Sequence, residues 1–337
     1  MKNILVTGAA GFIGFHLSRL LLSFGYKVSG IDNLNDYYEV SLKNSRLEIL
    51  LEHENFSFHL MDLASDVEMN KFAKKSKFDI IVNLAAQAGV QYSITNPHVY
   101  IDSNIRGFLN ILELSKTHEV EHLIYASSSS VYGLNKQMPF SEDHGTDHPI
   151  SLYAATKKSN ELMAHTYSYL FDIPTTGLRF FTVYGPWGRP DMALFKFTKA
   201  LIEQEKISIN NFGNHARDFT YVEDIVQGIV SVIDHPFEDA LTSPKLLTPS
   251  QSSAKWRILN IGRGEKVELM DFIHCIEKYF NREIQKEFLP LQPGDVAVTF
   301  CNTEKLQRDF EYNPSVSIEE GVKKFLDWYV DYYKINI

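Results

Sequence analysis

Short apolar segments alternate with segments of helical periodicity in the first half of this 337-residue chain, and this alternation limits the fold more than any other feature. The first apolar run, residues 2–6, ends at a glycine turn, and apolar residues then recur at helical spacing over 12–24. The later strand candidates cover 26–31, 56–60, 79–84 and 121–126, and the later helix candidates cover 66–75 and 98–118. This order predicts βαβ units and an α/β fold with a doubly wound, parallel sheet.

The pattern changes after about residue 175, where the segments become shorter and more irregular. We therefore expect a first domain over 1–175 and a smaller C-terminal α/β domain over 176–337. Residues 238–255 are rich in Ser, Thr and Pro, which predicts an exposed loop insertion.

Composition and charge exclude several classes of function. The net charge is −9, and nucleic-acid surfaces need clustered Lys and Arg, so we expect no nucleic-acid partner. No run of 18 apolar residues is present, and glycines interrupt the apolar start of the chain, which predicts a cytoplasmic protein without a membrane partner. Cys275 and Cys301 have no second cysteine nearby, and the histidines form no paired motif, so we expect no metal.

Three glycines, Gly8, Gly11 and Gly14, lie between the first strand and the first helix. Their spacing is one residue wider than that of the G-x-G-x-x-G dinucleotide motif, and a plain strand-to-helix turn could also use glycines. Glycines there would let the backbone approach a pyrophosphate, which the amides at the helix N-terminus would bind. The loop is thus a candidate dinucleotide site.

Two acidic residues at strand ends refine the cofactor prediction. Asp32 ends the second strand 18 residues after Gly14, where a carboxylate accepts hydrogen bonds from the adenosine ribose and repels a 2′-phosphate. NAD is therefore favoured over NADP. Asp62 could meet the adenine ring or could simply end a strand, and the small residues of Leu84–Ala86 would let the backbone pass beside the cofactor.

Tyr153 and Lys157 lie four residues apart, on one face of a predicted helix. An unperturbed tyrosine has a pKa of about 10, and a fixed cation nearby lowers it by roughly one to three units. The pair could then take a proton from an alcohol while hydride leaves for NAD. Such pairs arise by chance on many helices, but here one accompanies a glycine loop and Asp32.

Together, the stretches GAAGFIG, NLAA, SSSSVYG, YAATK and RDFTYVEDI resemble the extended short-chain dehydrogenase/reductase family over nearly the whole chain. The resemblance implies an NAD-binding Rossmann domain over 1–175 and a mainly substrate-binding domain over 176–337. In that family a Ser or Thr lies 25 residues before the catalytic Tyr, which identifies Ser128 here, with Ser129 orienting it or touching substrate. The expected cofactor site comprises Gly8, Gly11, Phe12, Ile13, Gly14, Asp32, Asn33, Asp62, Leu63, Leu84, Ala85, Ala86, Asn104, Tyr153, Lys157 and Phe180.

Further positions indicate the reaction and the substrate. Related dehydratases and decarboxylases carry Glu where this chain has Ser130, which has no useful pKa for removing water, so an epimerase is favoured. Arg217 stands where the family's Arg grips a diphosphate, although it could instead be a surface residue paired with Asp218. The stretch 179–197 resembles UDP-glucuronate 4-epimerases and implies substrate contacts from Thr182 and Arg189.

Gln91 departs from that resemblance, because bacterial glucuronate epimerases usually carry Arg at this position. The change could alter the preferred sugar, or it could be neutral at an exposed position. The expected function is NAD-dependent 4-epimerisation of a UDP-sugar, first UDP-glucuronate to UDP-galacturonate through a 4-keto intermediate. The alternatives are a UDP-glucose or UDP-N-acetylglucosamine 4-epimerase and, in another class, a catalytically idle regulator that binds NAD or sugar nucleotide. The resemblance also implies a homodimer through helices that start near His98 and Leu152.

Overall fold

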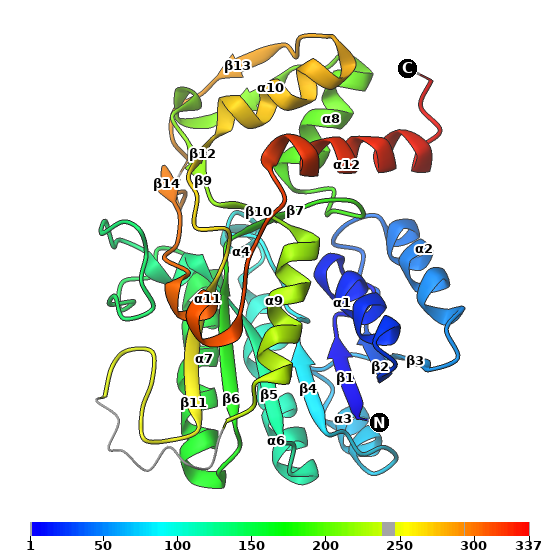
Figure 1. The fold of residues 1–337 in the computed structure, drawn as a ribbon, viewed down its shortest axis with the longest axis vertical. Coiled ribbons are helices and arrows are strands. Elements are labelled where there is room, and N and C mark those ends of the chain that lie inside the picture. Colours follow the sequence, from blue (N-terminus) through cyan, green and yellow to red (C-terminus); the bar gives the residue numbers. More distant parts are fainter. Residues whose placement is uncertain (1, 238–246, 293, 337) are drawn as a thin grey trace.

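A seven-stranded parallel sheet forms the centre of the molecule (Figure 1). The structure is a computed structural model that describes residues 2–237, 247–292 and 294–336. The strand order is β11-β6-β5-β4-β1-β2-β3, and every neighbouring pair runs parallel. The strands are β1 (Asn3–Thr7), β2 (Lys27–Asp32), β3 (Phe56–Leu60), β4 (Ile80–Asn83), β5 (His122–Ser128), β6 (Thr175–Phe180) and β11 (Trp256–Ile261). The predicted doubly wound α/β fold is confirmed.

Helices cover both faces of this sheet, so its strands are buried on two sides. Ile4 and Val6 of β1 pack into one core and Leu5 into another, as the alternation of side chains along a strand requires. The first core includes α1 (Phe12–Ser23) and α9 (Val222–Asp234), beside α11 (Glu304–Phe310). The second includes α3 (Asp66–Ala73), α6 (Gly107–His118) and α7 (Leu152–Phe171).

The helix expected over 98–118 is present but is not regular. It consists of α5 (Pro97–Tyr100), a π-helical turn η1 (Ile101–Arg106) and α6, and it follows the short helix α4 (Tyr92–Thr95). A π-helical turn holds an extra residue and often occurs at functional sites. The sequence pattern does not predict α2 (Val40–Leu51), which follows β2.

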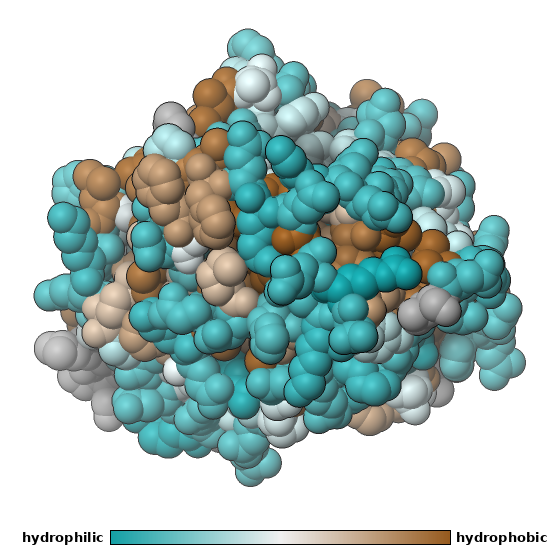
Figure 2. Space-filling model, turned by 90° about the horizontal axis from the view of Figure 1, so that it is seen from above, coloured by the Kyte–Doolittle hydropathy of each residue, from teal (hydrophilic) through white to brown (hydrophobic). Residues whose placement is uncertain are grey.

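A small domain lies over the carboxyl ends of the sheet strands and appears at the top of Figure 1. Its core is aromatic, with the rings of Phe219 and Phe272 stacked 4.1 Å apart. Figure 2 views it from above and shows mainly hydrophilic side chains, with hydrophobic ones in separate patches. It comprises β7 (Thr182–Tyr184), α8 (Ala193–Glu203), β8 (Ile207–Ile209), η3 (Asn210–Gly213), β9 (Ala216–Arg217), β10 (Phe219–Tyr221), β12 (Val267–Glu268), α10 (Leu269–Phe280), β13 (Lys286–Phe288), β14 (Val298–Thr299) and α12 (Ile318–Tyr332).

The border between the two parts is not a single point in the chain. Strands β6 and β11 belong to the central sheet although both extend beyond residue 175, so a division there remains a prediction. The loop expected over 238–255 lies partly outside the described residues. Its described end, 247–255, forms a turn in which Thr248 and Gln251 are bridged before β11 begins.

A fully buried ion pair joins helix α7 to strand β6. Arg179 donates from Nε to Oε1 of Glu161 at 2.8 Å and from Nη2 to Oε2 at 3.0 Å, and neither side chain is exposed. Ser127 of β5 also donates to Glu161, at 2.7 Å. Burial raises the pKa of Glu161, but the charge and hydrogen bonds of Arg179 outweigh this and hold that pKa below its usual value.

We expect Glu161→Gln to lower the free energy of unfolding by about 3 to 5 kcal/mol at pH 7, because the Arg179 charge would stay buried without its partner. Urea unfolding measures this change. Glu113→Gln, at a half-exposed carboxylate of α6, should change it by less than about 1 kcal/mol. Equal losses in the two variants would contradict the importance of the buried pair.

The stability difference should also depend on pH. Because the folded-state pKa of Glu161 is depressed, its contribution is complete above the unfolded-state value of about 4.3 and is lost as pH falls through the folded-state pKa. Wild type and Glu161→Gln should therefore converge in stability only in acid.

Candidate active site

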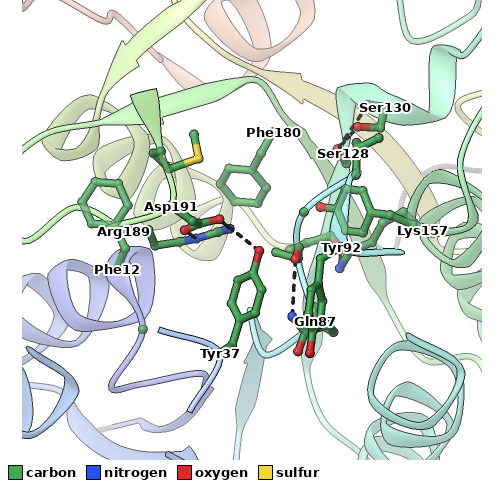
Figure 3. Close-up of a pocket in the computed structure, with 18 of the residues that line it drawn as sticks. Phe12, Tyr37, Gln87, Tyr92, Ser128, Ser130, Lys157, Phe180, Arg189 and Asp191 are labelled. Carbon is green, nitrogen blue, oxygen red and sulfur yellow. Dashed lines mark hydrogen bonds and ion pairs between the residues drawn. The ribbon is translucent and has the colours of Figure 1, made fainter. Parts of the chain in front are cut away.

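The carboxyl ends of the central strands open into a cavity of about 740 Å³ that the small domain also lines. A cavity of this size and position is where open α/β sheets bind their ligands. Figure 3 shows Phe12, Tyr37, Arg189 and Asp191 on one side and Ser128, Ser130 and Lys157 on the other. The predicted residues in the lining are Gly8, Gly11, Phe12, Ile13, Gly14, Asp32, Asn33, Asp62, Leu63, Leu84, Ala85, Ala86, Gln91, Ser128, Ser129, Tyr153, Lys157, Phe180, Thr182, Arg189 and Arg217.

The glycine loop has no room for side chains. Gly8 has a positive φ of +70°, and a Cβ there would lie 3.0 Å from the amide nitrogen of Ala85. A Cβ on Gly14 would lie 2.1 Å from the carbonyl oxygen of Gly8. Gly11 is the N-cap of α1, whose amide end faces an anion bound at this turn. The loop therefore fits a pyrophosphate held by backbone.

Asp32 is buried at the end of β2 and is already oriented by the backbone. Its carboxylate accepts from the amides of Ala10 at 3.2 Å and Leu34 at 2.9 Å. Burial raises its pKa, which these hydrogen bonds partly oppose. Asn33 donates to Asp62 at 3.1 Å, so the two strand ends form one polar wall. A fixed carboxylate beside a glycine loop fits the adenosine ribose of NAD.

The three side chains expected to carry the chemistry, Ser128, Tyr153 and Lys157, come from β5 and α7. Ser128 ends β5 and caps the short helix η2 (Ser129–Tyr132), accepting from the Ser130 amide and donating to its hydroxyl, both at 3.1 Å. Tyr153 and Lys157 lie on one face of the first turns of α7, as predicted. Ser127 also lines the cavity, and its hydroxyl donates to Glu161.

The electrostatics of Tyr153 differ from the expectation. Burial raises its pKa, while the Ser128 hydroxyl and the charge of Arg189 lower it less. Lys157 donates to the carbonyl of Ala126 at 2.9 Å, and burial lowers its own pKa to about 8. In the chain alone the pKa of Tyr153 is therefore raised, not lowered as expected, because desolvation is larger than the opposing effects of Ser128 and Arg189.

Arg189 and Arg217 reach the cavity from the small domain, each with a carboxylate partner. Arg189 forms a two-point pair with Asp191, at 2.9 and 2.5 Å, and Tyr37 donates to the same carboxylate at 3.2 Å. Arg217 pairs with Asp295 at 3.0 Å. The alternative pairing of Arg217 with Asp218 is wrong.

Asp218 lies fully buried behind the wall. It accepts from the amides of Arg263 at 2.8 Å and Gly264 at 2.9 Å, so it fixes the backbone next to Arg217.

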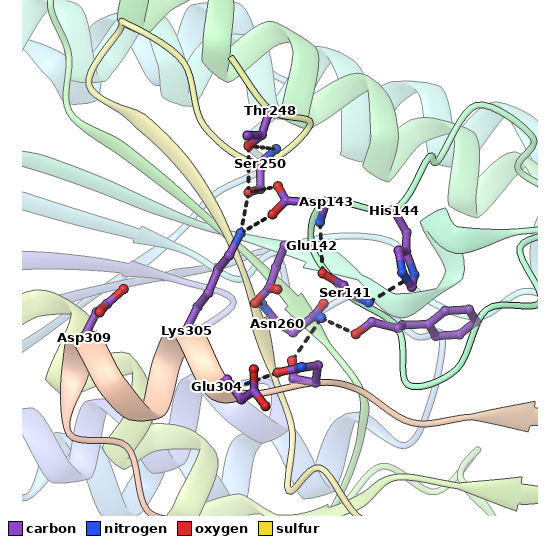
Figure 4. A network of polar contacts seen from close by, with 12 residues as sticks. Ser141, Glu142, Asp143, His144, Thr248, Ser250, Asn260, Glu304, Lys305 and Asp309 are labelled. Atoms are coloured by element: carbon purple, nitrogen blue, oxygen red, sulfur yellow. Dashed lines mark hydrogen bonds and ion pairs between the residues drawn. The ribbon is translucent and has the colours of Figure 1, made fainter. Parts of the chain in front are cut away.

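Residues 140–144, in the loop before α7, are held by a polar network (Figure 4). The amide of Asn260, on β11, donates to Glu142 at 3.0 Å, and its side chain donates to the carbonyl of Phe140 at 2.8 Å. Asp143 accepts from Lys305 of α11 at 2.6 Å and from Ser250 at 2.6 Å. Distant parts of the chain thus hold the loop that leads into the helix of Tyr153.

Asn104 is the predicted cofactor residue that does not line the cavity. It lies in the π-helical turn and is buried, where its side-chain oxygen accepts from the Gln87 amide at 2.8 Å and its side-chain nitrogen donates to the Gln87 carbonyl at 3.0 Å. It supports the wall from behind.

The sequence did not identify Tyr37, Lys43, Asp191 or Asp295, which do line the cavity. Asp191 lies within the stretch 179–197 but was not singled out there. Tyr37, Lys43 and Asp295 belong to no motif, because long-range folding brings them to the cavity.

The described residues give no support to a metal centre or a membrane span. Across the residues that the structure describes, no cluster of three or more His, Cys, Asp or Glu side chains is placed to hold a metal ion. Within the same residues, no helix is both long and apolar enough to cross a membrane.

Comparison with known proteins gives one consistent family. The family model described as GDP-mannose 4,6 dehydratase matches residues 5–325. Protein CapI of Staphylococcus aureus is 53% identical over 333 residues, covering 98% of this chain and 99% of that protein. A probable UDP-glucuronate 4-epimerase of Rhizobium meliloti is 45% identical over 333 residues, covering 98% and 97% of the two chains.

The same family appears among solved structures. The UDP-glucuronic acid 4-epimerase of Bacillus cereus, in complex with UDP-glucuronic acid and NAD, superposes with a TM-score of 0.86 at 34% identity and covers 98% of this chain and 100% of that one. The glycine loop, Asp32, Ser128 and the Tyr153–Lys157 pair lie around one cavity here, as the family resemblance implied. The chain therefore belongs to the GDP-mannose 4,6 dehydratase family of extended short-chain dehydrogenases/reductases, which includes NAD-dependent sugar-nucleotide 4-epimerases.

Proposed function

We propose that this protein is an NAD-dependent 4-epimerase of UDP-sugars and that it converts UDP-glucuronate to UDP-galacturonate. The carrying observation is that one cavity holds Ser128, Tyr153 and Lys157 near the buried ribose-binding candidate Asp32. The Bacillus cereus relative that binds UDP-glucuronic acid and NAD supports the choice of both ligands. An idle regulator would have no need for the three reactive side chains together.

The proposed roles of these residues follow from their chemistry. Tyr153 accepts the proton of the sugar 4-hydroxyl, Ser128 hydrogen-bonds the same oxygen, and Lys157 stabilises the tyrosine anion. Bound NAD would supply the hydride acceptor and, once reduced, the hydride donor at the sugar C4. The 4-keto sugar would have to turn in the site so that the hydride returns to its opposite face, which inverts C4. Tyr153 later returns its proton to the 4-oxygen. Since burial raises the pKa of Tyr153, the nearby positive charges must compensate for it in the working site.

The cofactor contacts assigned from the sequence remain part of this proposal. The glycine loop would bind the pyrophosphate, Asp32 the adenosine ribose, and Lys157 the nicotinamide ribose. Asn104 would act only through Gln87, which it holds. On the substrate side, Arg217 would bind the diphosphate, and Arg189 the nucleotide or sugar, each in place of its present carboxylate partner.

Ser130 argues against dehydration, although the family description names a dehydratase. Its hydroxyl is engaged with Ser128 and offers no acid or base at the neighbouring sugar carbon.

Gln91 supports keeping UDP-glucose and UDP-N-acetylglucosamine as alternative substrates. It lines the cavity and brings no positive charge for a sugar carboxylate. Thr182 and Ser129 also line the cavity and offer neutral hydroxyls that suit either a carboxylate or a neutral sugar.

We also propose that the protein is cytoplasmic and that it forms a homodimer. The thiols of Cys275 and Cys301 are free, which suits a reducing compartment. Large apolar side chains lie exposed along η1, α6 and α7, and a second copy of this surface would cover them. They are Ile101, Leu109, Leu162, Tyr169 and Leu170.

Purified protein incubated with UDP-glucuronate, without added NAD, should yield a mixture with UDP-galacturonate by NMR. Conversion would support epimerisation, bound cofactor and the acidic substrate together. If only UDP-glucose or UDP-N-acetylglucosamine is interconverted with its 4-epimer, the glucuronate proposal is refuted. The substrate is then a neutral sugar, and Gln91 becomes the candidate for the changed specificity.

Tyr153→Phe should lower kcat by about 10²-fold or more while nucleotide binding is retained, because only the proton-transferring hydroxyl is removed. Tyr279→Phe removes a hydroxyl of α10 that donates to Asp327 at 2.9 Å, outside the cavity and the proposed dimer surface, and should leave kcat unchanged. If wild type shows no turnover with any of the three sugars yet binds NAD and UDP, the regulator becomes the better proposal.

Leu162→Glu should convert the dimer to monomer, because a charge would be buried at the centre of the apolar surface on α7. Light scattering after size exclusion measures the mass. Leu60→Glu, at an equally exposed leucine on the far sheet edge, should leave the mass at that of the wild type. A monomeric wild type would refute the homodimer.

A further inference from the structure

Arg46 of helix α2 is a buried cation that the proposed chemistry does not use. Its side chain is fully buried, at 0% exposure. Among the described residues, no Asp, Glu or chain end pairs with its guanidinium. Its charge opposes the rise that burial causes in the pKa of Asp32, without a direct ion pair, and its Nε has no hydrogen-bond partner among the described residues. A buried charge without an ion pair is costly unless hydrogen bonds replace water, so the partners of Nη1 and Nη2 show what Arg46 holds.

Those partners lie in three segments: the glycine loop, the residues just before α2, and the segment before Arg189. Nη1 donates to the carbonyl of Ala10 at 2.8 Å, inside the glycine loop, and to the hydroxyl of Tyr38 at 2.8 Å. Nη2 donates to the carbonyls of Trp187 at 2.6 Å and Gly188 at 3.3 Å, directly before Arg189. One guanidinium thus bridges the cofactor loop to the segment that brings Arg189 to the cavity.

The bridged segment has a backbone that needs external support. Trp187 has a φ of +60°, in the left-handed region that bulky residues rarely adopt. Its ring packs on Phe15 of α1 at 5.5 Å, and His16 of the same helix contacts the carbonyl of Pro186 at 2.9 Å. The cofactor-binding part therefore holds the carbonyls of three successive residues of this segment.

The other end of the bridge is equally fixed. The amide of Ala10 donates to Asp32, while its carbonyl accepts from Arg46. Movement of the glycine loop would therefore displace both the proposed ribose contact, Asp32, and the Trp187 segment.

We propose that Arg46 is a positioning residue that fixes Arg189 in the sugar-nucleotide site by joining the glycine loop to the Trp187–Gly188 backbone. The inference rests on the proposed function, because it takes Arg189 as a substrate contact. A planar guanidinium has donors on two nitrogens that point to both loops at once, which the single ammonium of lysine cannot reproduce. Arg46 therefore acts mainly on substrate affinity, and only weakly on the proton transfer through the charge that Arg189 presents to Tyr153.

The test is a double-mutant cycle on the holoenzyme with UDP-glucuronate, using Arg46→Met, Arg189→Met and both together. We expect Arg46→Met to raise KM by about ten-fold with kcat changed less than about three-fold, since substrate binding and not chemistry is affected. In the Arg189→Met background, Arg46→Met should add little, because its effect passes through Arg189. Fully additive effects on KM would overturn the inference.

Two further variants separate positioning from stability. Leu50→Ala removes a buried side chain from the same helix without touching a hydrogen bond to either loop, and should lower stability while leaving KM unchanged. Arg46→Lys keeps the cation and should still raise KM. If Arg46→Met fails to fold, the lysine variant decides: an unchanged KM refutes positioning.

Failure of the proposed function is distinguishable from failure of this inference. If the wild type does not convert UDP-glucuronate, the proposed function is refuted, together with the role given to Arg189. A wild type that converts it, with a KM insensitive to Arg46→Lys or equally sensitive to Leu50→Ala, leaves the function intact and refutes only the bridge.

Discussion

The buried pair of Glu161 and Arg179 is the interaction on which the arrangement of the site depends. It fixes α7 against β6 and also takes a hydrogen bond from Ser127, the residue before Ser128. Lys157 lies about one turn and Tyr153 about two turns from Glu161 on the same helix, so a rotation of this helix against the sheet would displace both from Ser128. A paired charge in a dry core permits few alternative geometries, which suits reacting atoms that must be held to fractions of an ångström.

The other half of the site depends on contacts between the two parts of the chain. Tyr37 reaches Asp191, His16 reaches Pro186, and Arg46 reaches Trp187. All three come from the cofactor-binding part and end on the segment around Arg189. The walls for the two proposed ligands are thus one connected structure, and this connection gives a physical route by which occupation of one could affect the other.

The sequence predicted those features whose cause is local. Apolar runs and glycines identified five of the seven strands of the sheet and the Gly8–Gly14 turn, but not β6 or β11, and residue spacing placed Tyr153 with Lys157. It could not predict α2, whose polar and apolar residues follow no clear stripe, and so it missed Lys43 and Arg46. The direction of the Tyr153 pKa shift was wrong because desolvation depends on what the whole chain packs around the phenol.

The course of the chain through the sheet has a consequence for modularity. Because β6 and β11 complete the sheet from beyond residue 175, the first half alone would end at β5 with an open hydrogen-bonding edge and with Glu161 facing no arginine. Such an edge recruits other strands and favours aggregation. The small domain cannot therefore be exchanged by cutting the chain at one point. Natural or engineered recombination would have to keep these two strands with the first half of the chain.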